Sequence, residues 1–567
     1  MKFSEISYSR PDTEAVKAEM ERLTAALRSA VSFVEADELF LAMEKLTAGF
    51  DTMQTVASIR HDIDTRDEFY DGEQSFFDAV SPELEEYCQN WNRALLESPY
   101  RQDFAEKYNP VFLLNTEISL RTFSPEIIPE MQQENALCSE YAKLLASAQI
   151  PFEGETYTIA QIGPFKQDPD DERRLAAWKA EAGFYKENQE RLDGIYDELV
   201  QLRTAMGRKL GCENYTQLGY WRMGRNCYDR GDVEKFREAV VKYVVPVASD
   251  IYRRQAERLE KSYPLSFADA ALSFRSGNPK PCGAPDEILA EGRAFYHDLS
   301  PETAEFIDVM LDSELMDVLS RPGKAGGGYC TNLADFRLPF IFANFNGTSD
   351  DVETVTHEAG HAFADYMSRN VIPAESCWPS MEACEVHSMS MEFFAWAWAD
   401  RFYGEDARKF RYSHLSGALT FIPYGTMVDH FQHIVYDQPE LTPAGRHAVW
   451  KELLGIYMPW MKLDGDIPFY SEGEGWQRQH HIYELPFYYI DYCLAQTMSL
   501  QFWELIQEDK ASAWERYMAY TRPGGTKTFT DLIAGAGLLS PFDGECLRRV
   551  CEKAAVWLEQ YDMTGIV

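Results

Sequence analysis

The sequence predicts a mainly helical protein with a small amount of β-structure. Two stretches, 11–50 and Asp171 to about Leu210, place apolar residues three and four positions apart with charged residues between them, the pattern of amphipathic helices. Strand-like segments are few. GETYTIAQIGPF at 154–165 alternates like a strand or hairpin, and LPFIFANFNG at 338–347 is a short apolar and aromatic run. We therefore expect helices arranged around a small sheet.

The chain is too long for a single compact core. Its 567 residues are enough for two lobes or several subdomains. The segment from 262 to 284 is rich in Pro, Gly and Ser, which favours a surface loop or a join between subdomains. We find no internal repeat and no low-complexity segment.

The net charge narrows the possible partners. A formal charge of −38 disfavours nucleic acid and anionic membrane surfaces, because like charges repel. The N-terminus lacks the apolar core of a signal peptide, and no apolar run has the length of a membrane span. Eleven cysteines are scattered singly from Cys88 to Cys551 without a CxxC pair, as in reduced proteins. We expect a cytoplasmic protein that binds neither nucleic acid nor membranes.

The most glycine-dense segment is RPGKAGGGYC at 321–330. It lacks the GK[ST] ending of a phosphate-binding loop, and no GxGxxG follows a strand. We therefore expect a mobile loop over a cleft rather than a nucleotide site.

A helix is expected to begin just after the apolar run at 338–347. Asp350 and Glu353 have the spacing of an N-terminal capping box. The helix that they would open runs directly into the sequence HEAGH, so a strand, a turn and a helix deliver this motif in a defined order.

The HEAGH motif is typical of a metal site. His357 and His361 are four residues apart and project from the same face of a helix. Two imidazoles so placed can bind one zinc ion at about 2.0–2.1 Å each. Glu358 is displaced around the helix, where it can act as a general base on a water molecule. Gly360 leaves room for another element to approach the helix.

Two histidines leave zinc short of a third protein ligand. The next helix, expected from Pro379–Ser380, offers three glutamates and a histidine: Glu382, Glu385, Glu392 and His387. Glu385 and Glu392 are seven residues apart and share one face, which suits a ligand and a second carboxylate that supports the site. Spacing alone does not choose among the three glutamates.

At this point the motifs resemble a known family. HEAGHAF, followed by MEACEVHSMSMEFF, is similar to the M3 peptidases, which include thimet oligopeptidase, oligoendopeptidase F and the Pz-peptidases. The similarity extends through YTQLGYWRMGRNCY at 215–228 and VDHFQHIVYD at 428–437, and covers about residues 200 to 540. One departure is Ala364, where many bacterial members have a further histidine.

The resemblance implies the fold and the cofactor. It implies a gluzincin-type metallopeptidase, mainly α with a small sheet beside the active-site helix, whose two lobes enclose a deep substrate channel. Residues 1–200 would form part of the channel wall, and residues 201–567 would form the catalytic region. One zinc ion per chain would be held by His357, His361 and Glu385, with Glu392 behind them.

The resemblance also implies a second group of functional side chains in HHIYELPFYYIDYCLAQ at 480–496. In the family, His and Tyr residues of this motif bind substrate and stabilise the oxyanion. We expect His481, Tyr489 and Tyr492 to take these roles, with His480 and Tyr488 as alternatives. Aromatic residues at helical spacing are otherwise more often simple core packing.

Substrate contacts are expected at the sheet and the glycine-rich loop. The strand at 338–347 would be an edge strand that pairs with an extended peptide by β-augmentation, with Ala343 and Asn344 in contact. Gly327 and Gly328 of the loop would close over it. His430 and His433, three residues apart, suggest a second metal site, but no carboxylate pattern completes it and packing is the better interpretation.

The expected activity is therefore zinc-dependent endopeptidase hydrolysis of short oligopeptides. Two alternatives remain: a zinc exopeptidase that trims chain ends, and a catalytically silent peptide-binding homologue. The intact motif residues speak against the silent homologue. The sequence does not specify the oligomeric state or the preferred cleavage site.

Overall fold

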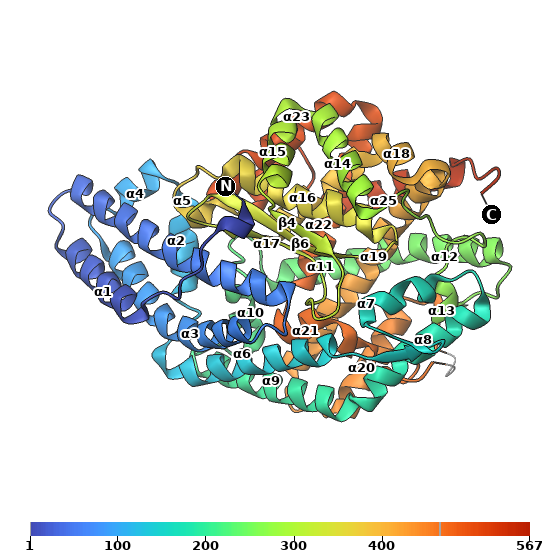
Figure 1. Ribbon diagram of the computed structural model, residues 1–567, viewed down its shortest axis with the longest axis horizontal. Coiled ribbons are helices and arrows are strands. Elements are labelled where there is room, and N and C mark those ends of the chain that lie inside the picture. The colour runs from blue at the N-terminus through green and yellow to red at the C-terminus, as the bar shows by residue number, and fades with distance from the viewer. Residues whose placement is uncertain (1, 464–466, 567) are drawn as a thin grey trace.

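The computed structural model describes residues 2–463 and 467–566. Its first helices form a group with a separate hydrophobic core at one end of the molecule (Figure 1). They are α1 (Thr13–Ser29), α2 (Phe33–Ile63), α3 (Glu68–Glu97), α4 (Arg101–Lys107) and α5 (Pro110–Ser119). Side chains of Asp12 and Ser32 cap the first two helices. The predicted helical character of 11–50 is confirmed, and the division of the chain at residue 200 remains a prediction.

The second predicted helical stretch is confirmed as two helices, α8 (Asp171–Glu187) and α9 (Gln189–Lys209), which follow α6 (Ile128–Ala146). The hairpin lies earlier than predicted. Its strands are β1 (Ile150–Phe152) and β2 (Glu155–Tyr157). The reason is the turn: Glu153 and Gly154 both have positive φ, 51° and 87°, as tight hairpin turns require. Thr158 then caps a short helix, α7 (Ile159–Ile162).

A three-stranded sheet lies beside the metal-site helix. Its strands are β4 (Met316–Leu319), β5 (Tyr329–Leu333) and β6 (Leu338–Phe345), in the order β4-β6-β5. The strand predicted at 338–347 is confirmed as β6. Its predicted place at the edge is wrong: β6 pairs in parallel with β4 and antiparallel with β5. The backbone groups of a doubly paired strand are already used, so no peptide can add along β6.

Helix α16 (Asp350–Ser368) carries the HEAGH motif and begins where the sequence predicts. The predicted capping box is wrong. Asp350 is itself the first helical residue, and Ser349 before it makes no side-chain cap bond. The preceding turn is held instead by Asp351, whose carboxylate accepts the backbone N–H groups of Asn346 and Gly347 at 2.8 and 2.9 Å.

Helices make up most of the remaining chain, with one further strand pair, β3 (Leu265–Ser266) and β7 (Met461–Lys462). The helices are α10 (Tyr215–Arg222), α11 (Arg230–Ala239), α12 (Val245–Leu259), α13 (Phe267–Ala270), α14 (Pro285–Leu299), α15 (Pro301–Asp312), α17 (Met381–Phe394), α18 (Ala399–Tyr403), α19 (Ala407–Asp437), α20 (Pro443–Tyr457), α21 (His480–Glu484), α22 (Tyr489–Glu508), α23 (Lys510–Thr521), α24 (Phe529–Gly535) and α25 (Gly544–Gln560).

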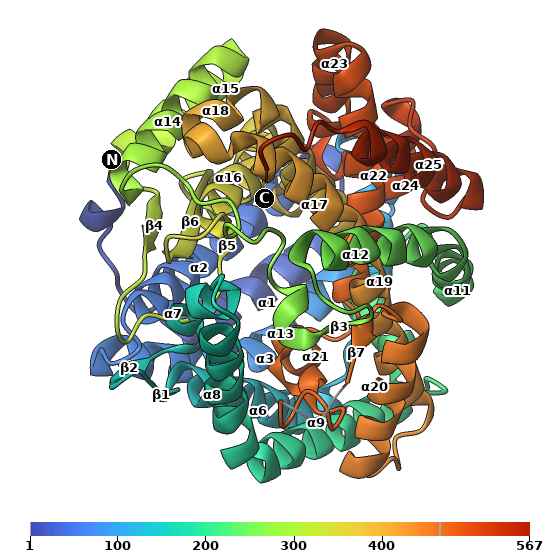
Figure 2. The same ribbon diagram turned by 90° about the vertical axis from the view of Figure 1, so that its right-hand side faces the viewer.

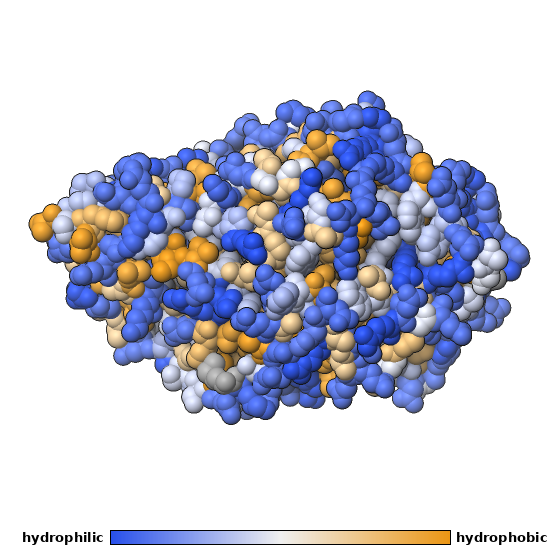
Figure 3. Space-filling view, turned by 90° about the horizontal axis from the view of Figure 1, so that it is seen from above, coloured by the Kyte–Doolittle hydropathy of each residue, from blue (hydrophilic) through white to orange (hydrophobic). Residues whose placement is uncertain are grey.

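Two groups of these helices lie on opposite sides of the sheet and the metal-site helix. In Figures 1 and 2, α14, α15 and α23 lie above α16 and the sheet, whereas α8, α9 and α20 lie below. This is the two-lobed, mainly helical arrangement that the sequence predicts. Hydrophilic residues cover most of the face shown in Figure 3. Among the described residues, we find no helix with the length and apolar character of a membrane span.

Helices α16 and α17 approach each other closely at Gly360. A Cβ atom at this position would lie 2.6 Å from the Ser388 Cα and 2.9 Å from the His387 carbonyl oxygen. Both are backbone atoms, so no side-chain rotation can make room. The glycine therefore sets the distance between the helix that carries the histidines and the helix that carries the glutamates.

We predict that Gly360→Ala lowers the free energy of unfolding by about 1–3 kcal/mol, because overpacking forces the two backbones apart. The same separation should weaken zinc binding. Gly183→Ala in α8 is the matched control, since nothing lies within 4 Å of the added Cβ. Denaturant titration and a zinc competition assay measure the two effects. Equal stabilities of the two variants would contradict the close-packing explanation.

Asp365 gives a second test of how α16 is packed. Its side chain is buried and accepts a hydrogen bond from Asn332 of β5 at 2.6 Å, whereas its other oxygen has no partner among the described residues. Burial raises the pKa of Asp365 to about 7. The unfolded carboxyl ionises near pH 4. Unfolding then releases a proton throughout this window.

We therefore predict that the folded chain loses stability as the pH rises from about 4 to 7, because the Asp365 carboxyl ionises in the unfolded chain and stays protonated in the folded one. Asp365→Asn mimics the protonated carboxyl and removes this contribution. The free energy of unfolding of the wild type, measured relative to that of the variant, should fall by a few kcal/mol across the window. A constant difference between the two proteins from pH 4 to 7 would mean that the carboxyl does not stay protonated.

Candidate metal centre

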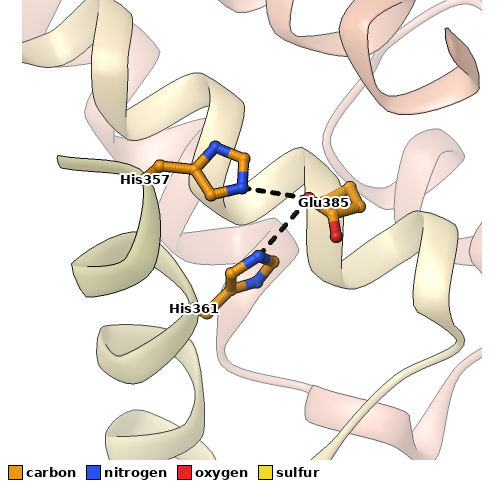
Figure 4. A group of neighbouring side chains, drawn as sticks. All are labelled: His357, His361 and Glu385. Carbon is orange, nitrogen blue, oxygen red and sulfur yellow. Dashed lines mark ion pairs between the residues drawn. The ribbon is translucent and has the colours of Figure 1, made fainter. Parts of the chain in front are cut away.

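Three side chains from two helices converge on one point (Figure 4). His357 and His361 project from the same face of α16, and Glu385 faces them from α17. The Nε2 atoms of both histidines lie 3.3 Å from Glu385 Oε2. Ligands bound to zinc at about 2.0–2.1 Å in tetrahedral geometry are about 3.3–3.4 Å apart. The spacing of these donor atoms therefore fits a four-coordinate zinc ion.

The electrostatics of Glu385 suit a metal ligand. Burial by itself would raise its pKa, but the charges and hydrogen bonds of the two histidines outweigh burial and hold the pKa well below its ordinary value. Metal ligands must be deprotonated. Glu385 is therefore a carboxylate at neutral pH in the position where a ligand is needed.

The structure distinguishes Glu385 from the other residues that spacing left open. Glu382 is buried on another side of α17, where its carboxylate accepts a hydrogen bond from Ser380 at 2.6 Å. His387 packs against the rings of Tyr517 and Tyr520. Neither joins His357 and His361, and no other group of three metal-ligating residues is found in the described part of the chain.

Glu358 lies next to this group but outside it. It follows His357 on α16, and a Cβ atom placed on Gly328 would lie 3.6 Å from Glu358 Oε1. Burial raises the pKa of Glu358, although the neighbouring imidazoles oppose the shift. A carboxylate with a raised pKa is a better proton acceptor than an ordinary glutamate. The two glutamates of the site thus have shifts of opposite direction.

The predicted second carboxylate contacts a metal-site histidine. Glu392 Oε1 lies 2.7 Å from His357 Nδ1, so the far nitrogen of the ring is held by a carboxylate, as is common for histidine ligands. Sequence analysis missed His414 of α19, whose Nε2 lies 2.8 Å from Glu392 Oε2. No spacing rule links His414 to α17, because only the packing of α19 brings them together.

Tyrosines of the motif at 480–496 also lie close to Glu385. Tyr488 donates a hydrogen bond to Glu385 Oε1. The Tyr492 hydroxyl lies 3.3 Å from His481 Nε2, and the charge of Glu385 contributes to the raised pKa of Tyr492, after burial. Tyr488, which we expected only as an alternative, is thus the tyrosine in direct contact with Glu385.

The remaining predicted residues of this motif lie farther from Glu385. The ring of Tyr489 packs near His481 and against Phe421 and Tyr424. His480 pairs with Glu484 at 3.0 Å, and about half of its side chain is exposed. Tyr489 thus lies among aromatic rings next to His481, and His480 is partly exposed to solvent.

The glycine-rich loop packs against β6 beside Glu358. Asn344 donates hydrogen bonds to the carbonyl groups of Ala325 and Gly327 at 2.8 and 2.9 Å. Lys324 donates to the carbonyl group of Ala343. A Cβ atom on Gly328 would lie 3.9 Å from the Ala343 Cα. The four predicted substrate contacts, Ala343, Asn344, Gly327 and Gly328, thus form one patch next to the site.

A cavity of about 270 Å³ adjoins the centre. Its lining includes Glu353, Glu392 and His414, together with Gln167 and Asn278. Gln167 ends the short turn before α8, and Asn278 lies between α13 and α14. Open space therefore reaches Glu392 and His414, the side chains behind His357.

The histidine pair of α19 does not form a second centre. His430 Nδ1 lies 3.0 Å from the Tyr457 hydroxyl, and His433 Nε2 lies 3.0 Å from the Tyr220 hydroxyl. The preference for ordinary packing at these two histidines is therefore supported by their hydrogen bonds.

The fold and the centre together define a peptidase with an HExxH helix. Family models agree: the peptidase M3 N-terminal domain matches residues 3–123, and peptidase family M3 matches residues 303–550. The chain belongs to peptidase family M3. It is a hydrolase that acts on peptides.

Individual relatives support this assignment. PZ peptidase A, solved with an inhibitor, is 45% identical with a TM-score of 0.97, over 99% of this chain and 100% of that chain. A protein described as an oligoendopeptidase F from Bacillus anthracis strain Ames is 41% identical with a TM-score of 0.93, over 100% of this chain and 99% of that chain. Oligopeptidase PepF from Bacillus subtilis is 22% identical over 93% of this chain and 81% of its own length.

Proposed function

We propose that the protein is a zinc-dependent endopeptidase that cleaves internal bonds of short oligopeptides in the cytoplasm. The observation that carries the proposal is the convergence of His357, His361 and Glu385 with donor spacings of 3.3 Å. This donor set of two imidazoles and a carboxylate suits zinc, and a fourth position is left for water or substrate. Glu358 stands beside the set without belonging to it.

The zinc ion, when bound, supplies Lewis acidity that polarises the peptide carbonyl and lowers the pKa of a water molecule. Glu358 accepts the proton of the attacking water. It then passes this proton to the amine that leaves when the C–N bond breaks. The raised pKa of Glu358, caused mainly by burial, favours both steps, because the acid and the base form are then closer in energy at neutral pH.

Side chains of the 480–496 motif are proposed to stabilise the oxyanion of the tetrahedral intermediate. We propose Tyr492 as the donor, because its hydroxyl lies 3.3 Å from His481 Nε2 and is close enough to Glu385 for that charge to raise its pKa. Tyr488 donates to Glu385 and would orient that ligand. Tyr489 remains a predicted donor that kinetics can separate from the other two.

The peptide backbone is proposed to lie along β5 rather than β6. β5 pairs with β6 on one side only, so its other edge keeps backbone groups that a peptide can use. It begins at Tyr329, directly after Gly328, which lies beside Glu358. A peptide on this edge would pass the general base. A channel enclosed by the two lobes would favour short, unfolded substrates.

Two alternatives are tested by substrates and chelators. An exopeptidase needs a free chain end, so a peptide blocked at both ends should resist it. We expect blocked and free forms of one fluorogenic peptide to be cleaved at similar rates. A silent binding homologue would cleave neither form, with or without zinc.

We predict that Glu358→Gln retains zinc but lowers kcat about 100- to 10,000-fold, because it removes the general base and leaves the three ligands intact. Metal analysis and cleavage of the fluorogenic peptide measure the two properties. Chelation should abolish wild-type activity, and added zinc should restore it. Normal turnover by Glu358→Gln would rule out its assigned role.

We predict different effects for the three tyrosines. Removal of an oxyanion donor lowers kcat by about 100- to 1,000-fold, and we expect this loss for Tyr492→Phe with zinc affinity unchanged. Tyr488→Phe should weaken zinc binding, because Glu385 loses a hydrogen bond. Tyr489→Phe is the comparison variant. If it shows the largest loss in kcat, the oxyanion donor is Tyr489.

A further inference from the structure

The structure assigns a role to His414, a residue outside the recognised motifs. We propose that His414 is a positioning residue that acts through Glu392 to fix the ring orientation and the tautomer of His357. The inference rests on the proposed function, since it concerns the zinc ligand His357. It adds to the centre a side chain on α19 that supports Glu392, which in turn supports His357.

The contacts form an unbroken polar chain. His357 Nδ1 lies 2.7 Å from Glu392 Oε1, and Glu392 Oε2 lies 2.8 Å from His414 Nε2. The indole N–H of Trp396 then donates to His414 Nδ1 at 3.0 Å. Three helical segments contribute, α16, α17 with the short turn that follows it, and α19.

The hydrogen bond from Trp396 to His414 determines which atoms donate and which accept in the other contacts. The nitrogen of an indole is a donor only, so His414 Nδ1 must be the acceptor. In a neutral imidazole the other nitrogen, Nε2, then carries the hydrogen and donates to Glu392. Both oxygens of Glu392 act as acceptors, and His357 must donate from Nδ1. Its Nε2 is left with a free lone pair directed at Glu385 and the metal position.

Two contacts of His414 act on its protonation in opposite directions. Burial lowers the pKa of His414, but the hydrogen bond and the charge of Glu392 outweigh burial and raise it. A protonated ring would direct an Nδ1–H against the Trp396 N–H, and two donors cannot share a hydrogen bond. Trp396 therefore favours a neutral His414 with its hydrogen on Nε2.

Packing holds the ring of His414 in this orientation. It is 7% exposed and lies against the rings of Phe393, Trp396 and Phe410, with centroid distances of 4.8, 5.9 and 5.2 Å. Rotation of the imidazole would break its hydrogen bonds to Glu392 and Trp396. The ring therefore keeps the N–H aimed at Glu392.

The two metal-site histidines differ in this respect. His361 Nδ1 is buried and has no hydrogen-bond partner among the described residues. Its ring is held by packing, whereas His357 is held by a directed chain of hydrogen bonds. Loss of His414 should therefore affect one ligand of the centre and leave the other unchanged.

Zinc affinity tests the proposal without reference to activity. Loss of an outer partner of a metal ligand typically lowers affinity about 10- to 100-fold, and we expect about tenfold for His414→Phe, whose ring fits the aromatic surroundings. His414→Gln retains an N–H donor near the position of Nε2 and should stay within about threefold of the wild type. Competition with a chromophoric chelator gives both values. Wild-type affinity in His414→Phe, or equal losses in both variants, would overturn the proposal.

A double-mutant cycle tests whether the effect passes through Glu392. If it does, His414→Phe should cause no further loss of zinc affinity in a Glu392→Gln background. Multiplied losses in the double variant would show that His414 acts by a separate route and would contradict the proposal.

The tautomer has its own readout. In the full-length zinc-loaded protein labelled with ¹⁵N-histidine, the His414 resonances, identified by their absence in His414→Gln, should report a neutral ring with hydrogen on Nε2. In Trp396→Phe this pattern should change. An imidazolium, or hydrogen on Nδ1, in the wild type would refute the proposed chain. A wild-type protein that binds zinc but cleaves no peptide would instead refute the proposed function and leave the affinity differences intact.

Discussion

The close approach of α16 and α17 is the contact on which the centre depends. The two histidines belong to one helix and Glu385 to the other, so the distance between the helix axes sets the distance between the donor atoms. Gly360 allows this distance, because any side chain there would meet the backbone of Ser388. Zinc coordination tolerates deviations of only about 0.2 Å. The close packing of the two backbones is therefore a precondition for metal binding.

The glutamates of the site have different pKa values because their surroundings differ. Glu385 faces two imidazoles, and its pKa is held low; Glu358 faces mainly a buried environment, and its pKa is raised. One carboxyl is therefore suited to hold a cation and the other to carry a proton. Glu392 belongs with the first type, because hydrogen bonds from His357 and His414 outweigh the burial that would raise its pKa.

The sequence predicted what depends on local spacing. Helix periodicity located α1, α2, α8 and α9, and the four-residue interval placed His357 and His361 on one face. The predictions failed for features that depend on residues distant in the sequence. The β6 segment was recognised as a strand, but its central place follows from β4 and β5, which its own residues do not encode. In the same way, spacing left Glu382, Glu385 and Glu392 open as ligands, because the packing of α17 against α16 is what distinguishes them.

The contact between Tyr488 and Glu385 shows why the tyrosines could not be ranked from spacing. Tyr488 follows Phe487, whose backbone has φ of 69°, a left-handed conformation that costs about 1–3 kcal/mol in a residue other than glycine. Arg225 stabilises this bend by donating to the Phe487 carbonyl and to Asp491. The Phe487 ring lies where Gly219 of α10 has no side chain; a Cβ atom there would be 2.6 Å from it. The bend turns Tyr488 towards Glu385, and its cause lies about 270 residues earlier in the chain than the tyrosine itself.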